Sequence, residues 1–146
     1  MRESLTSETK GRATRVWVAT VHVTDFDRSL RFYRDLLGFP VRLEARPFDW
    51  MEVGPEEPLC KIGLSLSRAG LTTQELVRPS GIVLEVDDMA AFASRLKSTS
   101  VPITRGPGKT PWGGVVVDFL DPDGNELQAV FDPDHYLRER DALRHP

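Results

Sequence analysis

The chain has 146 residues, 40% of them hydrophobic, which is enough for one domain with a single buried core. The formal net charge is −3 and no basic run could neutralise phosphates, so we expect no nucleic-acid partner. The apolar stretches are only strand-sized and residues 1–14 lack a signal-peptide core, so we expect no membrane partner and a soluble, cytoplasmic protein. The single cysteine, Cys60, excludes an internal disulfide, and we expect it to be a small buried side chain.

The first half of the chain predicts one strand, one helix and three more strands. Residues 16–23 alternate between two faces, with Trp17 on the inward face. Asp25 is a suitable N-cap for an amphipathic helix that ends at Gly38. The three further strands, bounded by proline and glycine, are expected at residues 39–44, 49–53 and 60–67.

The second half repeats this order. The phrase 23–25 (Val-Thr-Asp) is matched 63 residues later by 86–88 (Val-Asp-Asp), where Asp88 can cap a second helix. Residues 105–114 contain several glycines, and we interpret them as a mobile loop over a cleft. The remaining strands are expected at residues 101–103, 114–120 and 126–131.

Two phrases together resemble the vicinal oxygen chelate superfamily of glyoxalase, bleomycin-resistance and ring-cleaving dioxygenase proteins. They are residues 23–39 (VTDFDRSLRFYRDLLGF) and residues 121–125 (DPDGN). The resemblance implies an α+β fold in which two tandem β-α-β-β-β modules curl mixed sheets around a shared cleft, usually in a homodimer.

The expected organisation is one glyoxalase-like domain between two short terminal segments. The boundaries are a flexible N-terminal arm at 1–14, the domain at 15–131 with modules 15–67 and 80–131, and a C-terminal tail at 132–146.

Alternation along the first strand of each module predicts which side chains face the cleft. The helices require Trp17, Ala19 and Val21, and likewise Ile82, Leu84 and Val86, as packing partners. The opposite set therefore faces the cleft: Val18, Thr20, His22, Val83 and Glu85.

Enzymes that the sequence resembles bind a divalent metal through four cleft-facing side chains. The matching positions here are Val18, Gly81, Gln128 and, in the strand 60–67, either Gly63 or Ser65. Valine and glycine offer no donor and an amide is a weak one, so too few ligands remain for a stable site. We therefore expect no metal and no other cofactor.

Other polar side chains could in principle rebuild a site. His22, Glu85 and Asp118 could together bind a metal, and His22 and Glu85 are weak candidates for a catalytic acid/base pair. The competing interpretation is that they are polar groups at a wet cleft rim. His135 and His145 lie in the tail, where we expect them to be solvated.

Tryptophans suggest a wall for a planar or amphiphilic ligand. Trp50 and Trp112 lie near places where relatives of this kind line their pockets, although core or dimer-interface positions would suit tryptophan as well. The predicted ligand-binding residues are Val18, Thr20, His22, Trp50, Val83, Glu85, Trp112, Gln128 and Val130.

The leading hypothesis is a homodimeric, bleomycin-resistance-like protein that binds a small organic ligand in a metal-free cleft. One alternative is an enzyme of the same superfamily, either a metal-dependent lyase or ring-cleaving dioxygenase or a metal-independent isomerase that uses His22 and Glu85. Another is a structural dimer with a vestigial cleft. Fold alone does not decide between them.

Overall fold

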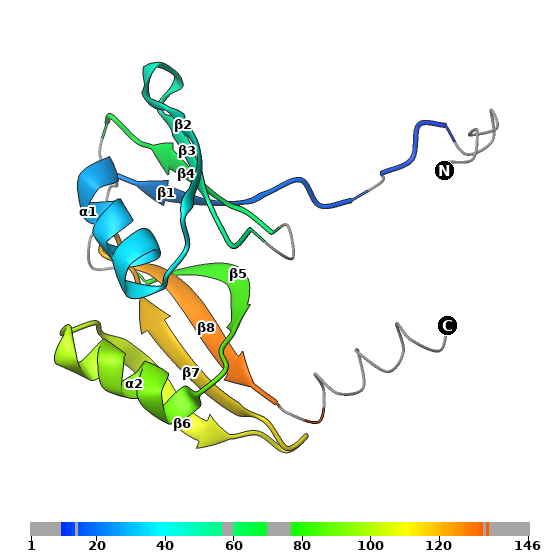
Figure 1. The fold of residues 1–146 in the computed structure, drawn as a ribbon, viewed down its shortest axis with the longest axis vertical. Coiled ribbons are helices and arrows are strands. Elements are labelled where there is room, and N and C mark those ends of the chain that lie inside the picture. The colour runs from blue at the N-terminus through cyan, green and yellow to red at the C-terminus, as the bar shows by residue number, and fades with distance from the viewer. Residues whose placement is uncertain (1–9, 14, 57–59, 70–76, 133, 135–146) are drawn as a thin grey trace.

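A computed structural model describes residues 10–13, 15–56, 60–69, 77–132 and 134. Its strands form two four-stranded sheets, ordered β1-β4-β3-β2 and β5-β8-β7-β6 (Figure 1). Each sheet comes from one continuous half of the chain, which confirms the predicted α+β fold built from two β-α-β-β-β modules. Of the predicted arm at residues 1–14 and the predicted tail at 132–146, only residues 10–13, 132 and 134 are among the described residues.

The first module consists of β1 (Ala19–Val23), α1 (Phe26–Leu30), the π-helix η1 (Arg31–Leu36), β2 (Val41–Ala45), the 3-10 turn η2 (Arg46–Phe48), β3 (Trp50–Val53) and β4 (Ile62–Leu66). The second module consists of β5 (Arg78–Glu85), α2 (Met89–Ser98), β6 (Ile103–Lys109), β7 (Val115–Leu120) and β8 (Asn125–Phe131).

Both helices begin at the predicted N-caps. The Asp25 carboxylate accepts a hydrogen bond from the Arg28 amide at 3.0 Å, and the Asp88 carboxylate accepts one from the Ala91 amide at 3.0 Å. Each bond satisfies an amide that has no partner within its helix. None of the helices in the described ranges is long and apolar enough to span a membrane.

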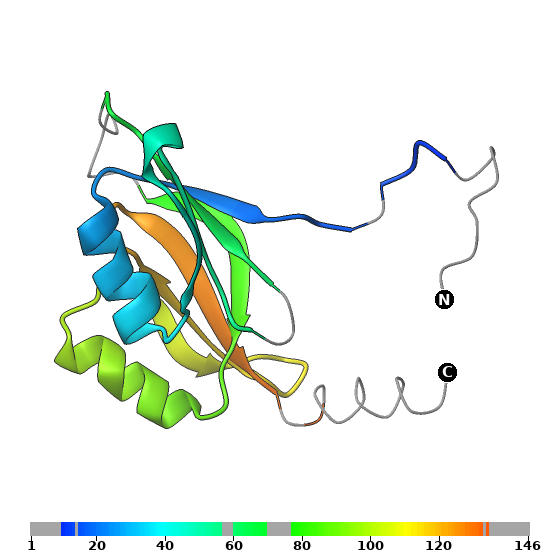
Figure 2. The same ribbon diagram turned by 45° about the horizontal axis from the view of Figure 1, so that its top comes forward.

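Both helices pack on the same side of the two sheets (Figure 2). Val21 and Val23 of β1 are buried with Leu64 of β4 on this side, while the alternate residues Thr20 and His22 are exposed. In the second module Leu127 and Phe119 are buried in the same way. The predicted assignment of strand faces is therefore confirmed for β1, because only the helix-covered face is removed from water.

Two predicted core residues are exposed. Strand β1 begins at Ala19, so Trp17 precedes the sheet and is 63% exposed, which makes the predicted core position wrong. Its ring instead stacks with Arg15, at 4.9 Å, and with Lys61, at 4.6 Å, as cation-π pairs. Cys60 is also exposed, because it precedes β4 and lies outside the sheet.

Residues 105–109, predicted as part of a loop, belong to β6. This strand is at the edge of its sheet and its register with β7 shifts twice, between Ile103 and Arg105 and again before Gly108. An edge strand with bulges tolerates a proline such as Pro107, which has no amide to donate. The predicted loop is therefore confined to the short connection between β6 and β7.

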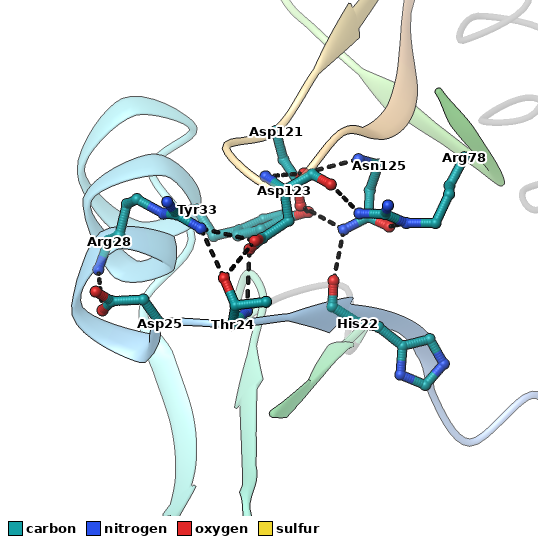
Figure 3. A network of polar contacts seen from close by, with 9 residues as sticks. All are labelled: His22, Thr24, Asp25, Arg28, Tyr33, Arg78, Asp121, Asp123 and Asn125. Carbon is teal, nitrogen blue, oxygen red and sulfur yellow. Dashed lines mark hydrogen bonds and ion pairs between the residues drawn. The ribbon is translucent and has the colours of Figure 1, made fainter. Parts of the chain in front are cut away.

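A buried polar network joins the two modules (Figure 3). The carboxylate of Asp123, in the β7–β8 turn, accepts hydrogen bonds from the Thr24 hydroxyl and from Arg28 Nη2, each at 2.6 Å. In the same turn, Asp121 accepts a bond from the Tyr33 hydroxyl at 2.7 Å. Burial raises the pKa of Asp121, although hydrogen bonds from Asn125 and Tyr33 oppose this effect.

This network also fixes β1 beside the second module. The Asn125 side-chain amide donates to the His22 carbonyl at 2.8 Å, and strands β1 and β5 contact each other. Figure 3 shows the imidazole of His22 pointing away from the network. The helix-free faces of the two sheets therefore lie next to each other along β1 and β5.

Candidate functional site

The helix-free face of the two sheets, called the open face below, carries most of the predicted ligand-binding residues. Strand register places Thr20 opposite Gly63 on one sheet and Val83 opposite Gln128 on the other. The open face includes Thr20, His22, Trp50, Glu52, Gly63, Ser65, Val83, Glu85, Asp118, Gln128 and Val130.

In the first module, a buried carboxylate organises the open face. Glu52 on β3 is 6% exposed. It accepts a hydrogen bond from the Trp50 indole at 2.9 Å and forms an ion pair with Lys61 at 3.0 Å. Burial opposes the negative charge, but the bonds from Trp50 and Lys61 outweigh it, so the pKa of Glu52 lies below its usual value. Lys61 in turn stacks on Trp17. The result is a continuous series of aromatic and charged groups from Trp50 to Trp17.

In the second module, Asp118 on β7 plays the corresponding part. It is 8% exposed, accepts a hydrogen bond from the Gln128 side-chain amide at 2.8 Å, and pairs with Arg105 Nε at 2.8 Å. A pocket of about 230 Å³ opens here over β5 and β8. Its lining includes Gly81, Val83, Arg105, Asp118 and Gln128.

The two carboxylates are equivalent in the repeat. Glu52 lies directly opposite Gly63 across β3 and β4, and Asp118 lies directly opposite Gln128 across β7 and β8. Sequence reasoning missed Glu52, and it treated Asp118 as a metal ligand or as a polar group at a wet cleft rim, whereas Asp118 is buried. The usable signal was an acidic residue in an otherwise apolar strand, at matching positions of both modules.

The same register resolves the fourth metal-ligand position. Gln128 pairs with Val83, two residues beyond Gly81, and Gly63 pairs with Thr20, two residues beyond Val18. Gly63 is therefore the equivalent of Gln128, and Ser65 is not.

The residues at these positions do not fit a metal. A Cβ atom at Gly63 would come within 2.2 Å of the Trp50 ring, so the indole fills the space of a ligand side chain. Gly81 has a φ of 72°, a conformation that a histidine or glutamate adopts only with strain. The Gln128 amide nitrogen donates to Asp118, so only the amide oxygen, a weak ligand, could reach a metal, and Val18 has no ligand atom in its side chain.

The proposed substitutes do not meet either. Within the described part of the chain, no three His, Cys, Asp or Glu side chains are grouped so that they could hold a metal ion. His22 is exposed on β1, and no hydrogen bond or ion pair joins it to Glu85 or Asp118 among the residues that are described.

The other predicted site residues occupy varied positions. Val83 is 54% exposed on the open face, and Val130 and Trp50 are partly buried there. Val18 precedes β1 and is partly buried. Glu85, at the end of β5 and opposite Val130, is on the open face by register and is exposed, and it also borders a groove on the helix side.

Trp112 lies in the connection between β6 and β7 and is 57% exposed. Its ring folds back over Gly114, where a Cβ atom would come within 2.2 Å of the indole. A large ring is therefore presented to solvent beside the start of β7, supported underneath by a residue without a side chain.

Two larger grooves lie on the helix side, with volumes of about 380 Å³ and 320 Å³. The larger is lined by apolar groups such as Leu36, Phe39 and Phe92, together with Glu85 and Asp88. Neither groove contains a residue at the four metal-ligand positions. The smaller pocket on the open face does, and for that reason it is the candidate site.

Fold and site together define a protein of two β-α-β-β-β modules. Its open face carries a small pocket at the metal-ligand positions, where the residues do not form a metal-binding set. A model of the Glyoxalase/Bleomycin resistance protein/Dioxygenase superfamily matches residues 15–129. The chain belongs to this superfamily.

Three similar proteins illustrate its range. A lactoylglutathione lyase from Haemophilus influenzae is 28% identical over 117 residues, which cover 75% of this chain and 87% of the lyase. A solved structure of a superfamily member from Sphaerobacter thermophilus has a TM-score of 0.70 and 28% identity, over 82% of this chain and 98% of that one. The solved structure of TnmS3, an antibiotic binding protein from Streptomyces sp. CB03234, has a TM-score of 0.66 and 26% identity, over 82% of this chain and 96% of that one.

Proposed function

We propose that this protein binds a small organic ligand on its open face without a metal. The observation that carries the proposal is that the four metal-ligand positions do not offer a set of side chains that could bind a metal. Trp50 occupies the space above Gly63, and Gly81 has a backbone conformation that disfavours a ligand side chain. Restoring a metal site would therefore require changes beyond single substitutions.

The chemistry of the open face suits an organic ligand. Trp50 and Trp112 offer aromatic surface, and Val83 is an exposed apolar side chain opposite the pocket residue Gln128. Two polar groups on this face, the Trp50 indole and the Gln128 amide, are fixed by hydrogen bonds to the buried carboxylates of Glu52 and Asp118. Apolar walls with a small number of fixed polar groups are the usual composition of a small-molecule site. The similarity to an antibiotic binding protein supports the same function.

The alternative is an enzyme of the same superfamily, supported by the similarity to a lactoylglutathione lyase. A metal-dependent reaction would need donors that the described residues do not bring together. A metal-independent isomerase would need His22 and Glu85 to act on a common substrate, but His22 is on β1 and Glu85 is at the far end of β5, and no hydrogen bond or ion pair joins the two side chains among the described residues. Binding without catalysis is the function that these positions support best.

Metal analysis tests the proposal directly. Protein purified without chelator is examined by mass spectrometry before and after incubation with nickel, zinc and iron, and its melting temperature is recorded with and without EDTA. We expect no stoichiometric metal and an unchanged melting temperature, since a ligand that binds only the folded state would raise it. Near-stoichiometric metal, or a clear fall in melting temperature with EDTA, would return the enzyme alternative to first place.

Ligand binding is tested by thermal-shift screening of aromatic and amphiphilic small molecules. For any molecule that binds, Trp112→Ala should weaken binding about tenfold, the usual order for losing a buried aromatic contact, and leave the melting temperature of the free protein unchanged. Phe48→Ala is the matched control, because Phe48 is an exposed aromatic in the equivalent β2–β3 connection. Equal effects of the two substitutions would remove Trp112 from the site.

A further inference from the structure

The two equivalent carboxylates of the open face hold cations of very different exposure. Lys61, the partner of Glu52, is 15% exposed and is covered by the Trp17 ring. Arg105, the partner of Asp118, is 71% exposed. Lys61 is therefore shielded from solvent, whereas Arg105 is exposed. Of these two cations, only Arg105 lines the pocket on the open face.

The Arg105 guanidinium is fixed through its Nε atom, and its two terminal nitrogens could contact a ligand. Its Nε pairs with Asp118, and Asp118 is itself fixed by burial and by the bond from Gln128. The guanidinium carries five N–H donors, four of them on the two terminal nitrogens. Among the described residues, no hydrogen bond or ion pair uses those terminal nitrogens.

We propose that Arg105 is a specificity-determining residue that selects ligands bearing a carboxylate or a similar oxyanion. This rests on the proposed binding function and names the ligand class for the same site. A guanidinium presents parallel donors at the spacing of two carboxylate oxygens, so the terminal nitrogens match such a group better than a neutral amide. The anchored Nε reduces the rotamer freedom lost on binding.

Neighbouring charges set the orientation of the ligand. The negative charge of Asp118 is matched by Arg105, so it does not by itself repel an anion beside the terminal nitrogens. Glu126 lines the same pocket, and its carboxylate accepts a hydrogen bond from the Thr104 hydroxyl at 2.8 Å. No cation is paired with Glu126 among the described residues. The oxyanion should therefore lie at the Arg105 end, and the aromatic body should extend over Val83.

The test compares two probes of the same shape, 2-naphthoate and 2-naphthamide, titrated against the full chain and followed by tryptophan fluorescence. We expect 2-naphthoate to bind about 10- to 100-fold more tightly, the range of a charge-assisted hydrogen bond. Arg105→Met should abolish this preference, and Arg105→Lys should retain only part of it. Lys109→Met, which removes an exposed cation from the same strand, should leave it unchanged.

Arg105→Met leaves the buried Asp118 without its cation, so a second variant combines it with Asp118→Asn. Melting temperatures establish that each variant is folded. Equal affinity of the wild type for the two probes would overturn the role of Arg105 and leave the binding function standing. The same conclusion would follow if the preference survived in Arg105→Met and in its combination with Asp118→Asn. Failure of both probes to bind or to stabilise the wild type at millimolar concentration would count against the binding function as well.

Discussion

The hydrogen bond from Tyr33 to Asp121 should contribute strongly to the stability of the whole chain. Its two partners are 88 residues apart, and both are buried, so the bond connects helix η1 of the first module to the β7–β8 turn of the second. Tyr33→Phe removes only the hydroxyl and retains the edge-to-face contact with Phe32 at 4.9 Å. Asp121 keeps its bonds from Asn125 and from the amide of Asp123.

Because the acceptor is a buried carboxylate, we expect Tyr33→Phe to lower the free energy of unfolding by about 2 kcal/mol, within the range for hydrogen bonds to charged groups. With a urea dependence of roughly 2 kcal/mol per M, the unfolding midpoint should fall by about 1 M. The measurement is urea unfolding at pH 7, followed by far-ultraviolet circular dichroism. A matching loss of fluorescence and dichroism would show that both modules unfold together.

A double-mutant cycle with Asp121→Asn isolates the bond from other effects, and we expect a coupling energy above about 1 kcal/mol. The control cycle uses Arg68→Met and Asp49→Asn, an ion pair whose arginine is 72% exposed and whose coupling should stay below about 0.5 kcal/mol. A coupling of Tyr33 to Asp121 no larger than this control would refute the reasoning, because the bond would then have no special role between the modules.

Three further predictions follow from burial and charge. Val21→Asp should unfold the protein, because it buries an unpaired charge beneath α1 at a cost of about 5 kcal/mol, whereas Thr20→Asp on the open face should leave circular dichroism and melting temperature nearly unchanged. The pKa of Glu52 is lower in the folded state, so its stabilising ion pair is present above about pH 4.5 and is lost as the pH falls below that value. The difference in unfolding free energy between wild type and Glu52→Gln should therefore shrink between about pH 7 and pH 3. Light scattering at micromolar concentration should give the mass of a homodimer, and a monomeric mass would contradict the expectation drawn from the family resemblance.

Local pattern predicted the elements well where the chain is regular. Asp25 and Asp88 identified the helix starts, because an N-cap depends only on a side chain and an amide three residues later. Alternation identified the buried face of β1 at Val21 and Val23. The same alternation failed at Trp17, because it cannot show where a strand leaves its sheet.

The β6 region shows a different limit. Its glycines and Pro107 are typical of loops, yet the residues from Ile103 to Lys109 pair with β7. Only an edge position permits this, and whether a strand is at an edge depends on the order of strands in the completed sheet.

Most of the candidate site's geometry came from the tertiary structure. The sequence showed that Val18, Gly81 and Gln128 lack the donors of a metal site, but it could not show that the Trp50 ring covers Gly63 or that Glu52 and Asp118 are equivalent. Such relations depend on strand register, which brings together side chains that are distant in the chain.

By itself, the sequence determined the superfamily, the two-module order and the absence of the usual ligand types at particular positions. These features are local, since each is set by residue identity or by short-range periodicity. The tertiary structure decided that the turn at residues 121–125 joins the modules through Thr24, Arg28 and Tyr33, and that the exposed side chain of Arg105 lines the pocket. These are contacts between distant segments, and they exist only once the sheets have paired and the modules have packed.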